Sequence, residues 1–99
     1  MKNKKASNKE QAKQSAVSFT DNGWEDYQHW QKTDPLLAEK VNQLIDACKS
    51  DPFKGIGKPE PLKGNLTELW SRRIDREHRL VYAMLEGTLQ IVACRFHYS

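Results

Sequence analysis

Three side chains in the second half of this chain could together carry out acid–base chemistry on a phosphodiester: Glu60, Arg79 and His97. Cleavage of RNA without a metal needs a base that takes the proton of the 2′-hydroxyl, an acid that protonates the leaving 5′-oxygen, and cations around the phosphate. A carboxylate, an imidazole and a guanidinium could fill these roles. Pro59 and Pro61 stiffen the backbone on both sides of Glu60, so a loop could present its carboxylate with little loss of entropy. These residue types indicate a metal-independent ribonuclease.

Each of these signals has an ordinary explanation when it is taken alone. A loop carboxylate such as Glu60 is more often simply solvated. A histidine near a chain end, such as His97, is more often a surface residue than a catalyst. Clustered arginines could form an RNA-binding face or a solvated strand face, and composition alone does not decide between these readings. The arginines are Arg72, Arg73, Arg76, Arg79 and Arg95.

The composition limits the class of protein. The 99 residues suffice for one domain, and Lys and Arg outnumber Asp and Glu by 16 to 13, which suits nucleic-acid binding only where the charges cluster. No apolar segment is long enough to cross a bilayer, and no apolar stretch follows the N-terminal lysines to form a signal peptide. We therefore expect a cytoplasmic protein.

The two cysteines show neither the spacing of a metal site nor the density of a disulfide framework. Cys48 and Cys94 are far apart in the sequence and belong to different expected elements. We expect both to be reduced and buried as small apolar residues, with a nucleophilic Cys94 as the alternative. The sequence predicts no metal site and no cofactor.

Residues 1–15 differ in composition from the rest of the chain. They are almost wholly polar, contain five lysines and lack aromatic residues, so they cannot contribute to a core. We expect a disordered or weakly helical extension, with an electrostatic role on RNA as the alternative. Residues 16–99 are expected to form the folded domain.

A short strand and a first helix should open this domain. The strand is expected at residues 16–19, and Thr20 or Asp21 is suited to cap the helix that follows. Three aromatic residues then recur at helical spacing, which is more typical of a core-facing stripe than of a base-stacking surface. They are Trp24, Tyr27 and Trp30.

A second helix should begin at Asp34 and Pro35. Aspartate caps free N–H groups, and proline fits the first helical position, where its missing donor does no harm. The helix is expected to end near residues 50–52, and the short connection at 32–35 makes the pair a two-helix hairpin. Its apolar stripe consists of Leu37, Val41, Leu44, Ile45 and Cys48.

Three strands should follow a loop rich in glycine and proline. The loop is expected at residues 53–65 and the strands at 68–75, 79–85 and 88–96, which are rich in Leu, Ile, Val, Tyr and Trp. Packing of the helical hairpin on this antiparallel meander predicts an α+β fold.

The register of the last hairpin decides whether Arg79 and His97 share a face of the sheet. Directly paired residues share a face, and side chains alternate between the faces along each strand. Arg79 and His97 therefore share a face only if the residue numbers of each pair sum to an even number. We therefore predict the three-residue loop 85–87, with Gly87 in the left-handed region. A two-residue turn at Glu86 and Gly87 would put Arg79 on the opposite face, unless the strand bulges or ends before His97.

Four blocks of sequence occur in order between about Val17 and Tyr98. They read GKPEPLK at 57–63, LWSRRI at 69–74, EHRLVY at 77–82 and ACRFHY at 93–98. Together they resemble the signature blocks of the YoeB (Txe/YoeB) toxins, a branch of the RelE superfamily of toxin–antitoxin mRNA interferases. The resemblance implies a RelE-like, microbial-ribonuclease-like fold and a ribosome-dependent endoribonuclease that cuts mRNA. It also implies an inhibiting antitoxin of the YefM/Phd type, and it leaves a homodimer open.

The resemblance further implies roles for individual residues. Glu60 matches the general base, Arg79 the stabiliser of the phosphate and His97 the general acid. Tyr98 matches a tyrosine that lies near the scissile phosphate or stacks on a base. Matching cationic positions and the arginine cluster predict further RNA or phosphate contacts. These are Lys63, Arg72, Arg73 and Arg95.

A binding module for RNA or antitoxin that has lost turnover is the main alternative. The presence of Glu60, Arg79 and His97 together favours the enzyme, because the loss of any one would have favoured the module. A DNA-binding regulator acting alone is disfavoured, since the sequence shows neither a helix-turn-helix nor a basic recognition helix.

Overall fold

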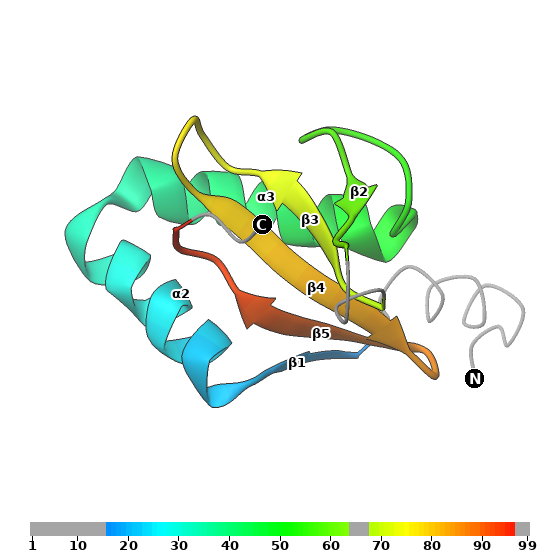
Figure 1. The fold of residues 1–99 in the computed structure, drawn as a ribbon. Helices are drawn as coiled ribbons and strands as arrows, with labels where there is room; N and C mark the ends of the chain where they lie inside the picture. The colour runs from blue at the N-terminus through cyan, green and yellow to red at the C-terminus, as the bar shows by residue number, and fades with distance from the viewer. Residues whose placement is uncertain (1–15, 64–67, 97–99) are drawn as a thin grey trace, which may run out of the picture.

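The computed structural model describes residues 16–63 and 68–96, which form one sheet with two helices on one of its faces (Figure 1). The elements are β1 (Val17–Phe19), α2 (Asp21–Thr33), α3 (Pro35–Ser50), β2 (Glu60–Pro61), β3 (Trp70–Arg73), β4 (Arg79–Leu85) and β5 (Thr88–Ala93). The strand order is β1-β5-β4-β3-β2, with β1 parallel to β5 and the other neighbours antiparallel. The predicted α+β fold is confirmed, although β1 makes the sheet mixed.

Both helices begin at the caps that the sequence predicts. The hydroxyl oxygen of Thr20 accepts a hydrogen bond from the N–H of Gly23 at 3.0 Å. The carboxylate of Asp34 accepts one from the N–H of Leu37 at 3.2 Å, and Pro35 occupies the first turn of α3. Only Asp34 separates the helices, so they pack against each other as well as on the sheet.

The main core lies between the helices and one face of the sheet. The side chains that α3 and the central strands bury there are almost wholly apolar, which supplies most of the stabilising burial. They include Val41, Leu44, Cys48, Leu80, Tyr82, Leu89 and Ile91. A smaller apolar cluster, formed by Leu62, Val81 and Ala93, contains no helix residue and lies on the other face.

Trp24 is an exception to the predicted aromatic core. Trp30 is buried and Tyr27 is half-buried, but 46% of Trp24 is exposed. Side chains three residues apart on a helix differ in direction by about 60°. Counted back from the buried Trp30, the side chain of Trp24 has therefore turned away from the sheet. Its ring packs at the surface on Phe19 and Tyr27, at centroid distances of 5.2 and 5.7 Å. The core prediction for Trp24 is wrong.

The β4–β5 hairpin closes with a two-residue turn. Leu85 pairs with Thr88, which leaves Glu86 and Gly87 as the turn, so the predicted three-residue loop is wrong. Both turn residues have positive φ, 49° and 83°, as the favoured two-residue hairpin turns require.

A bulge in β5 restores the register that the turn alone would have lost. Tyr82 pairs with Ile91, but Val81 pairs with Ala93, so Val92 is an extra residue in β5. Between the turn and the bulge, the residue numbers of each pair sum to an odd number, as for Tyr82 and Ile91. Beyond the bulge they sum to an even number, as for Val81 and Ala93. As a result Ala93 lies with Val81 on the face away from the helices. A bulge thus offsets the two-residue turn, which is the exception that the sequence prediction allows.

Residues 60–61 form an edge strand where the sequence predicts loop. Glu60 pairs with Ser71 and Pro61 with Trp70. A two-residue strand has no alternating pattern to detect, and proline usually marks a turn. At a sheet edge, however, the missing N–H of proline costs no ladder hydrogen bond. Glu60 is therefore fixed to the sheet and not carried by a free loop.

β3 and β5 are shorter than predicted, because the chain leaves the sheet after Arg73 and after Ala93. The extension predicted at residues 1–15 lies outside the described residues. In the part of the chain that the structure describes, neither helix is long and apolar enough to cross a bilayer.

Candidate active site

Glu60 lies on the face of the sheet opposite α2 and α3, here called the open face. Paired residues of antiparallel strands point to the same side of a sheet. The pairs Glu60–Ser71, Ser71–Val81 and Val81–Ala93 therefore form one row across β2, β3, β4 and β5. Val81 and Ala93 are buried in the small apolar cluster, whereas Glu60 is exposed. The carboxylate of Glu60 thus lies at the edge of the small apolar cluster on the open face.

Two of the predicted cations occupy the next row of the open face. Arg73 on β3 pairs with Arg79 on β4, two residues along from Ser71 and Val81. With strands about 4.8 Å apart and about 3.4 Å per residue, the Cα atoms of Glu60, Arg73 and Arg79 lie within roughly 12 Å of one another. Side chains of this length can converge on one phosphate across that span.

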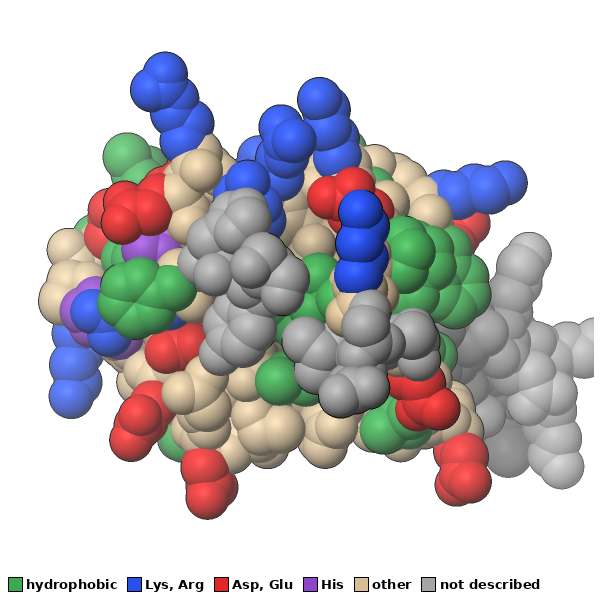
Figure 2. Space-filling model, viewed as in Figure 1, with side chains coloured by type: hydrophobic (Ala, Val, Ile, Leu, Met, Phe, Trp, Pro, Cys, Tyr) green, Lys and Arg blue, Asp and Glu red, His purple; other side chains and the backbone are tan. Residues whose placement is uncertain are grey.

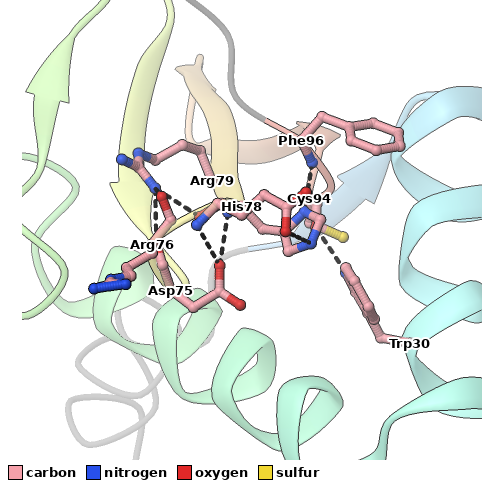
Figure 3. A network of polar contacts seen from close by, with 8 residues as sticks. Trp30, Asp75, Arg76, His78, Arg79, Cys94 and Phe96 are labelled. Atoms are coloured by element: carbon pink, nitrogen blue, oxygen red, sulfur yellow. Dashed lines mark hydrogen bonds and ion pairs between the residues drawn. The ribbon is translucent and has the colours of Figure 1, made fainter.

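The guanidinium of Arg79 is tethered to the β3–β4 turn. Its Nη1 donates to the carbonyl oxygens of Asp75 at 2.8 Å and His78 at 3.0 Å (Figure 3). Its hydrogen bonds to described residues use Nη1 alone, so Nε and Nη2 remain to meet a phosphate. The tether orders the side chain before any ligand binds, which lowers the entropy cost of binding.

Arg72 does not belong to this face. It is fully buried among the core side chains. Its Nε donates to the hydroxyl of Tyr82 at 3.1 Å, and its Nη1 donates to the carbonyl of Ile56 at 2.9 Å. Its Nη2 donates to the carbonyls of Asp51 and Lys54. Arg72 therefore ties the loop after α3 to the sheet, and the predicted phosphate contact is wrong because the guanidinium has no exposed surface.

The other predicted residues lie at the margins of the described ranges. Lys63 is exposed at the end of the first range. Arg95 is half-buried, and its guanidinium carbon lies 4.8 Å from the ring centroid of Phe96. His97 and Tyr98 lie outside the described residues, so their roles stay predictions.

The last described residues are held against α2 and β4 by hydrogen bonds. The carbonyl of Cys94 accepts from Nε1 of Trp30 at 2.7 Å, and its N–H donates to the carboxylate of Asp26 at 3.0 Å. Two residues on, the carbonyl of Phe96 accepts from the backbone N–H of Arg79 at 3.0 Å. The described chain therefore ends beside the first residue of β4, next to the cations of the open face.

A shallow pocket beside Arg73 and Arg79 contains further cations. Lys40 comes from α3, Lys58 from the loop before β2 and Arg76 from the β3–β4 turn. In Figure 2, Lys and Arg side chains gather along the upper edge of the view, over β2 and β3, while more of the acidic ones lie along the lower edge. We use the term cation pocket for the part of this pocket that Lys40, Lys58 and Arg76 form.

Of the residues of the cation pocket, the sequence predicts a possible RNA-binding role only for Arg76, and none for Lys40 or Lys58. Arg76 belongs to the arginine cluster, and Lys58 is the second residue of one of the four signature blocks, so both carry a signal in the sequence. Lys40 carries no such signal in the sequence, because only the packing of α3 behind the sheet brings it to this edge.

Burial makes both cysteines unreactive. Cys48 and Cys94 are free and fully buried, as predicted. Burial raises the pKa of Cys48 to about 11 and that of Cys94 to about 12. Because the thiolate is the reactive form, the structure does not support a nucleophilic Cys94. Among the described residues, no group of three or more His, Cys, Asp or Glu could hold a metal ion.

The buried carboxylate of Asp26 should make stability depend on pH. Burial raises the pKa of Asp26 above 3.8, although the hydrogen bond from Cys94 opposes this shift. The folded state therefore keeps its proton to higher pH than the unfolded state, so stability is lost as pH rises from about 4 through the folded pKa. Asp26→Asn keeps an acceptor for Cys94 and should remove this loss. Urea unfolding from about pH 4 to about pH 7 tests this, with the exposed Asp46→Asn as control. Parallel curves for the parent and Asp26→Asn would contradict it.

Comparison with known proteins places this chain in a family. The family model described as YoeB-like toxin of bacterial type II toxin-antitoxin system matches residues 19–98. The chain is also 54% identical over 82 residues to the Toxin YoeB of Streptomyces coelicolor, an alignment that covers 83% of this chain and 98% of that protein.

Two solved structures agree with this assignment. The YoeB dimer from Staphylococcus aureus is similar with a TM-score of 0.80 and 40% identity, over 85% of this chain and 98% of that one. The heterotetrameric YoeB-YefM toxin-antitoxin complex from the same organism is similar with a TM-score of 0.78 and the same identity and coverage. The chain therefore belongs to the YoeB family of toxins of bacterial type II toxin–antitoxin systems.

Proposed function

We propose that this chain is a ribosome-dependent endoribonuclease that cuts mRNA by metal-independent acid–base catalysis and so arrests translation. The observation that carries the proposal is the open face. Glu60 lies one row away from Arg73 and Arg79 on this face. The backbone of Arg79 in turn holds Phe96, which is joined directly to His97. A base, two cations and the segment that leads to an acid thus meet at one end of the sheet.

The proposed reaction follows from the chemistry of these groups. Glu60 takes the proton of the 2′-hydroxyl, and the 2′-oxygen attacks phosphorus. Arg73 and Arg79 stabilise the charge that develops on the phosphate oxygens. His97 gives a proton to the departing 5′-oxygen, which leaves a 2′,3′-cyclic phosphate on one product and a 5′-hydroxyl on the other. Tyr98 would lie near the scissile phosphate or stack on a base.

The proposed partners are the ribosome with its mRNA and an antitoxin of the YefM/Phd type, all in the cytoplasm. The Staphylococcus aureus YoeB structures show a dimer and a complex with YefM, and we extend both to this chain. An acidic antitoxin segment could meet Arg73 and Arg79 with carboxylates and compete with RNA phosphates for them. Lys63 and Arg95 would add phosphate contacts at the margins of the site.

Cleavage assays with ribosomes and mapped mRNA ends test this function. We expect 5′-hydroxyl ends, which a kinase labels without prior phosphatase, and 2′,3′-cyclic phosphate ends. We also expect the rate to survive a chelator that removes transition metals while the magnesium needed by ribosomes is held constant. Loss of activity in that chelator would contradict metal independence. Ribosome binding without any cleavage would favour the alternative, a binding module that has lost turnover.

The cation pocket should contribute RNA affinity without contributing to the chemical step. Replacing both Lys58 and Arg76 with glutamine is expected to reduce the slope of log affinity against log salt by about 0.7 for each phosphate that the variant no longer neutralises. The measurement uses a single-stranded RNA with a 2′-deoxy nucleotide at the cleavage site, so that it cannot be cut. The exposed Lys32 on α2 provides the control variant, Lys32→Gln. An unchanged slope in the double variant would exclude the pocket from the RNA path.

A further inference from the structure

Phe96 has both of its backbone polar groups occupied by the β3–β4 region. Its N–H donates to Nδ1 of His78 at 2.7 Å, and its carbonyl accepts from the N–H of Arg79 at 3.0 Å (Figure 3). Its φ is 68°, in the left-handed region that residues with a side chain seldom adopt. Such a backbone persists only where surrounding contacts hold it, and the two hydrogen bonds supply those contacts.

His78 is itself rigidly held. Its backbone N–H donates to the Asp75 carboxylate at 2.7 Å, and its carbonyl accepts from the N–H of Ile74 at 2.9 Å. The side chain is 11% exposed and lies close to two aromatic rings, with centroid distances of 4.8 Å to Trp30 and 5.8 Å to Phe96. Because Nδ1 accepts a hydrogen bond, it carries no proton, and the neutral ring has its proton on Nε2.

His78 has no part in the acid–base steps proposed above. Its Nδ1 is used by Phe96, and its Nε2 lies 3.7 Å from the carboxylate of Glu77, beyond hydrogen-bond distance. The side chain presents only 11% of its surface to solvent, which leaves little of it open to RNA. What the imidazole does supply is one well-placed acceptor, directed at the residue before His97.

We propose that His78 is a positioning residue, which acts by fixing the Phe96 backbone through Nδ1 and so holding the chain end that carries His97. This inference rests on the proposed function, in which His97 is the general acid. One peptide bond joins the anchored residue to His97, so the anchor sets the point from which the chain continues into His97. Misplacement of a catalytic group by about 1 Å can cost on the order of a hundredfold in rate.

A pair of substitutions separates the acceptor from the shape of the ring. His78→Phe keeps an aromatic ring between Trp30 and Phe96 but replaces Nδ1 by a C–H group. His78→Asn loses the ring, but its Oδ1 takes nearly the position of Nδ1 and can accept the same hydrogen bond. If His78 contributes only packing, His78→Phe is the milder change. If it acts through Nδ1, His78→Asn is the milder change.

The first measurement is hydrogen exchange of the Phe96 amide in the full chain. In His78→Phe we expect this amide to exchange on the order of ten- to a hundredfold faster than in the parent, and in His78→Asn within about threefold of the parent. The amide of Leu89, which donates to Ala16 in the sheet, lies outside the His78–Phe96 contact and serves as the internal reference. An unchanged Phe96 amide in His78→Phe would overturn the inference without reference to any activity.

The second measurement is single-turnover cleavage at saturating ribosomes, together with the affinity for ribosomes. His78→Phe should cleave at least about tenfold more slowly with nearly parental affinity, because a positioned acid acts mainly in the transition state. His78→Asn should recover most of the rate. Parental cleavage by His78→Phe, or equal loss in both variants, would overturn the positioning role. Absence of cleavage by the parent would instead overturn the proposed function, and amide exchange would still decide whether His78 anchors Phe96.

Discussion

Glu60→Gln is expected to slow single-turnover cleavage of mRNA by a factor on the order of a hundred or more, because glutamine cannot take the proton of the 2′-hydroxyl. The structure makes this a clean test. Glu60 is exposed on the edge strand β2, so its replacement disturbs neither the core nor the sheet ladder. Ribosome affinity and thermal stability should therefore stay close to those of the parent. Glu39→Gln, which changes an exposed glutamate on α3, is the matched control.

The pH dependence of cleavage tests the division of roles between acid and base. If Glu60 is the base and His97 the acid, the parent profile should be bell-shaped, because one group must be ionised while the other stays protonated. Glu60→Gln should then lose the acidic limb, and His97→Gln should lose the alkaline limb. A parent bell that survives intact in both variants would show that other groups transfer the protons.

The second large effect concerns stability. Arg72→Ala is expected to lower the free energy of unfolding by about 3 kcal/mol or more, because it removes four hydrogen bonds from a charged donor and opens a cavity. The acceptors of these bonds belong to Tyr82, Ile56, Asp51 and Lys54. Burial raises the pKa of Tyr82, so its hydroxyl stays neutral and donates to the carbonyl of Pro52 at 2.6 Å. Without Arg72, the loop after α3 loses its main attachment to the sheet.

The neighbouring arginine provides the matched control for this prediction. Arg73 is exposed on the opposite face of the same strand, so Arg73→Ala should change the unfolding free energy by no more than about 0.5 kcal/mol. Urea denaturation of both variants measures the difference directly. RNA affinity should show the reverse order, with Arg73→Ala weakening binding in a folded protein. Equal stability of the two variants would contradict the structural role of Arg72.

Features that depend on a few adjacent residues were predictable from the sequence. The caps at Thr20 and Asp34 satisfy N–H groups three residues away, so short-range chemistry defines both helix starts. The order of elements and the α+β fold follow from periodicity in the same way. The four sequence blocks also led to the YoeB family, which the comparisons confirm.

Assigning a residue to a face of the sheet required the tertiary structure. Arg72 and Arg73 are identical in type and adjacent in sequence, yet one is a buried structural residue and the other an exposed cation. Alternation along a strand guarantees that they differ, but only the pairing of β3 with its neighbours decides which one faces the helices. The extra residue Val92 likewise sets the face of Ala93, through its pairing with Val81, twelve residues earlier in the sequence.

The sequence thus determined the chemical types available for the site and the elements that carry them. Only the tertiary structure decided that Glu60 is fixed on an edge strand, that Lys40 reaches the cation pocket, and that His78 holds Phe96. The physical reason is the range of the interactions. Caps and turns are stabilised within a few residues, whereas strand register, edge pairing and the anchoring of the chain end depend on contacts between distant segments, which local sequence patterns do not specify.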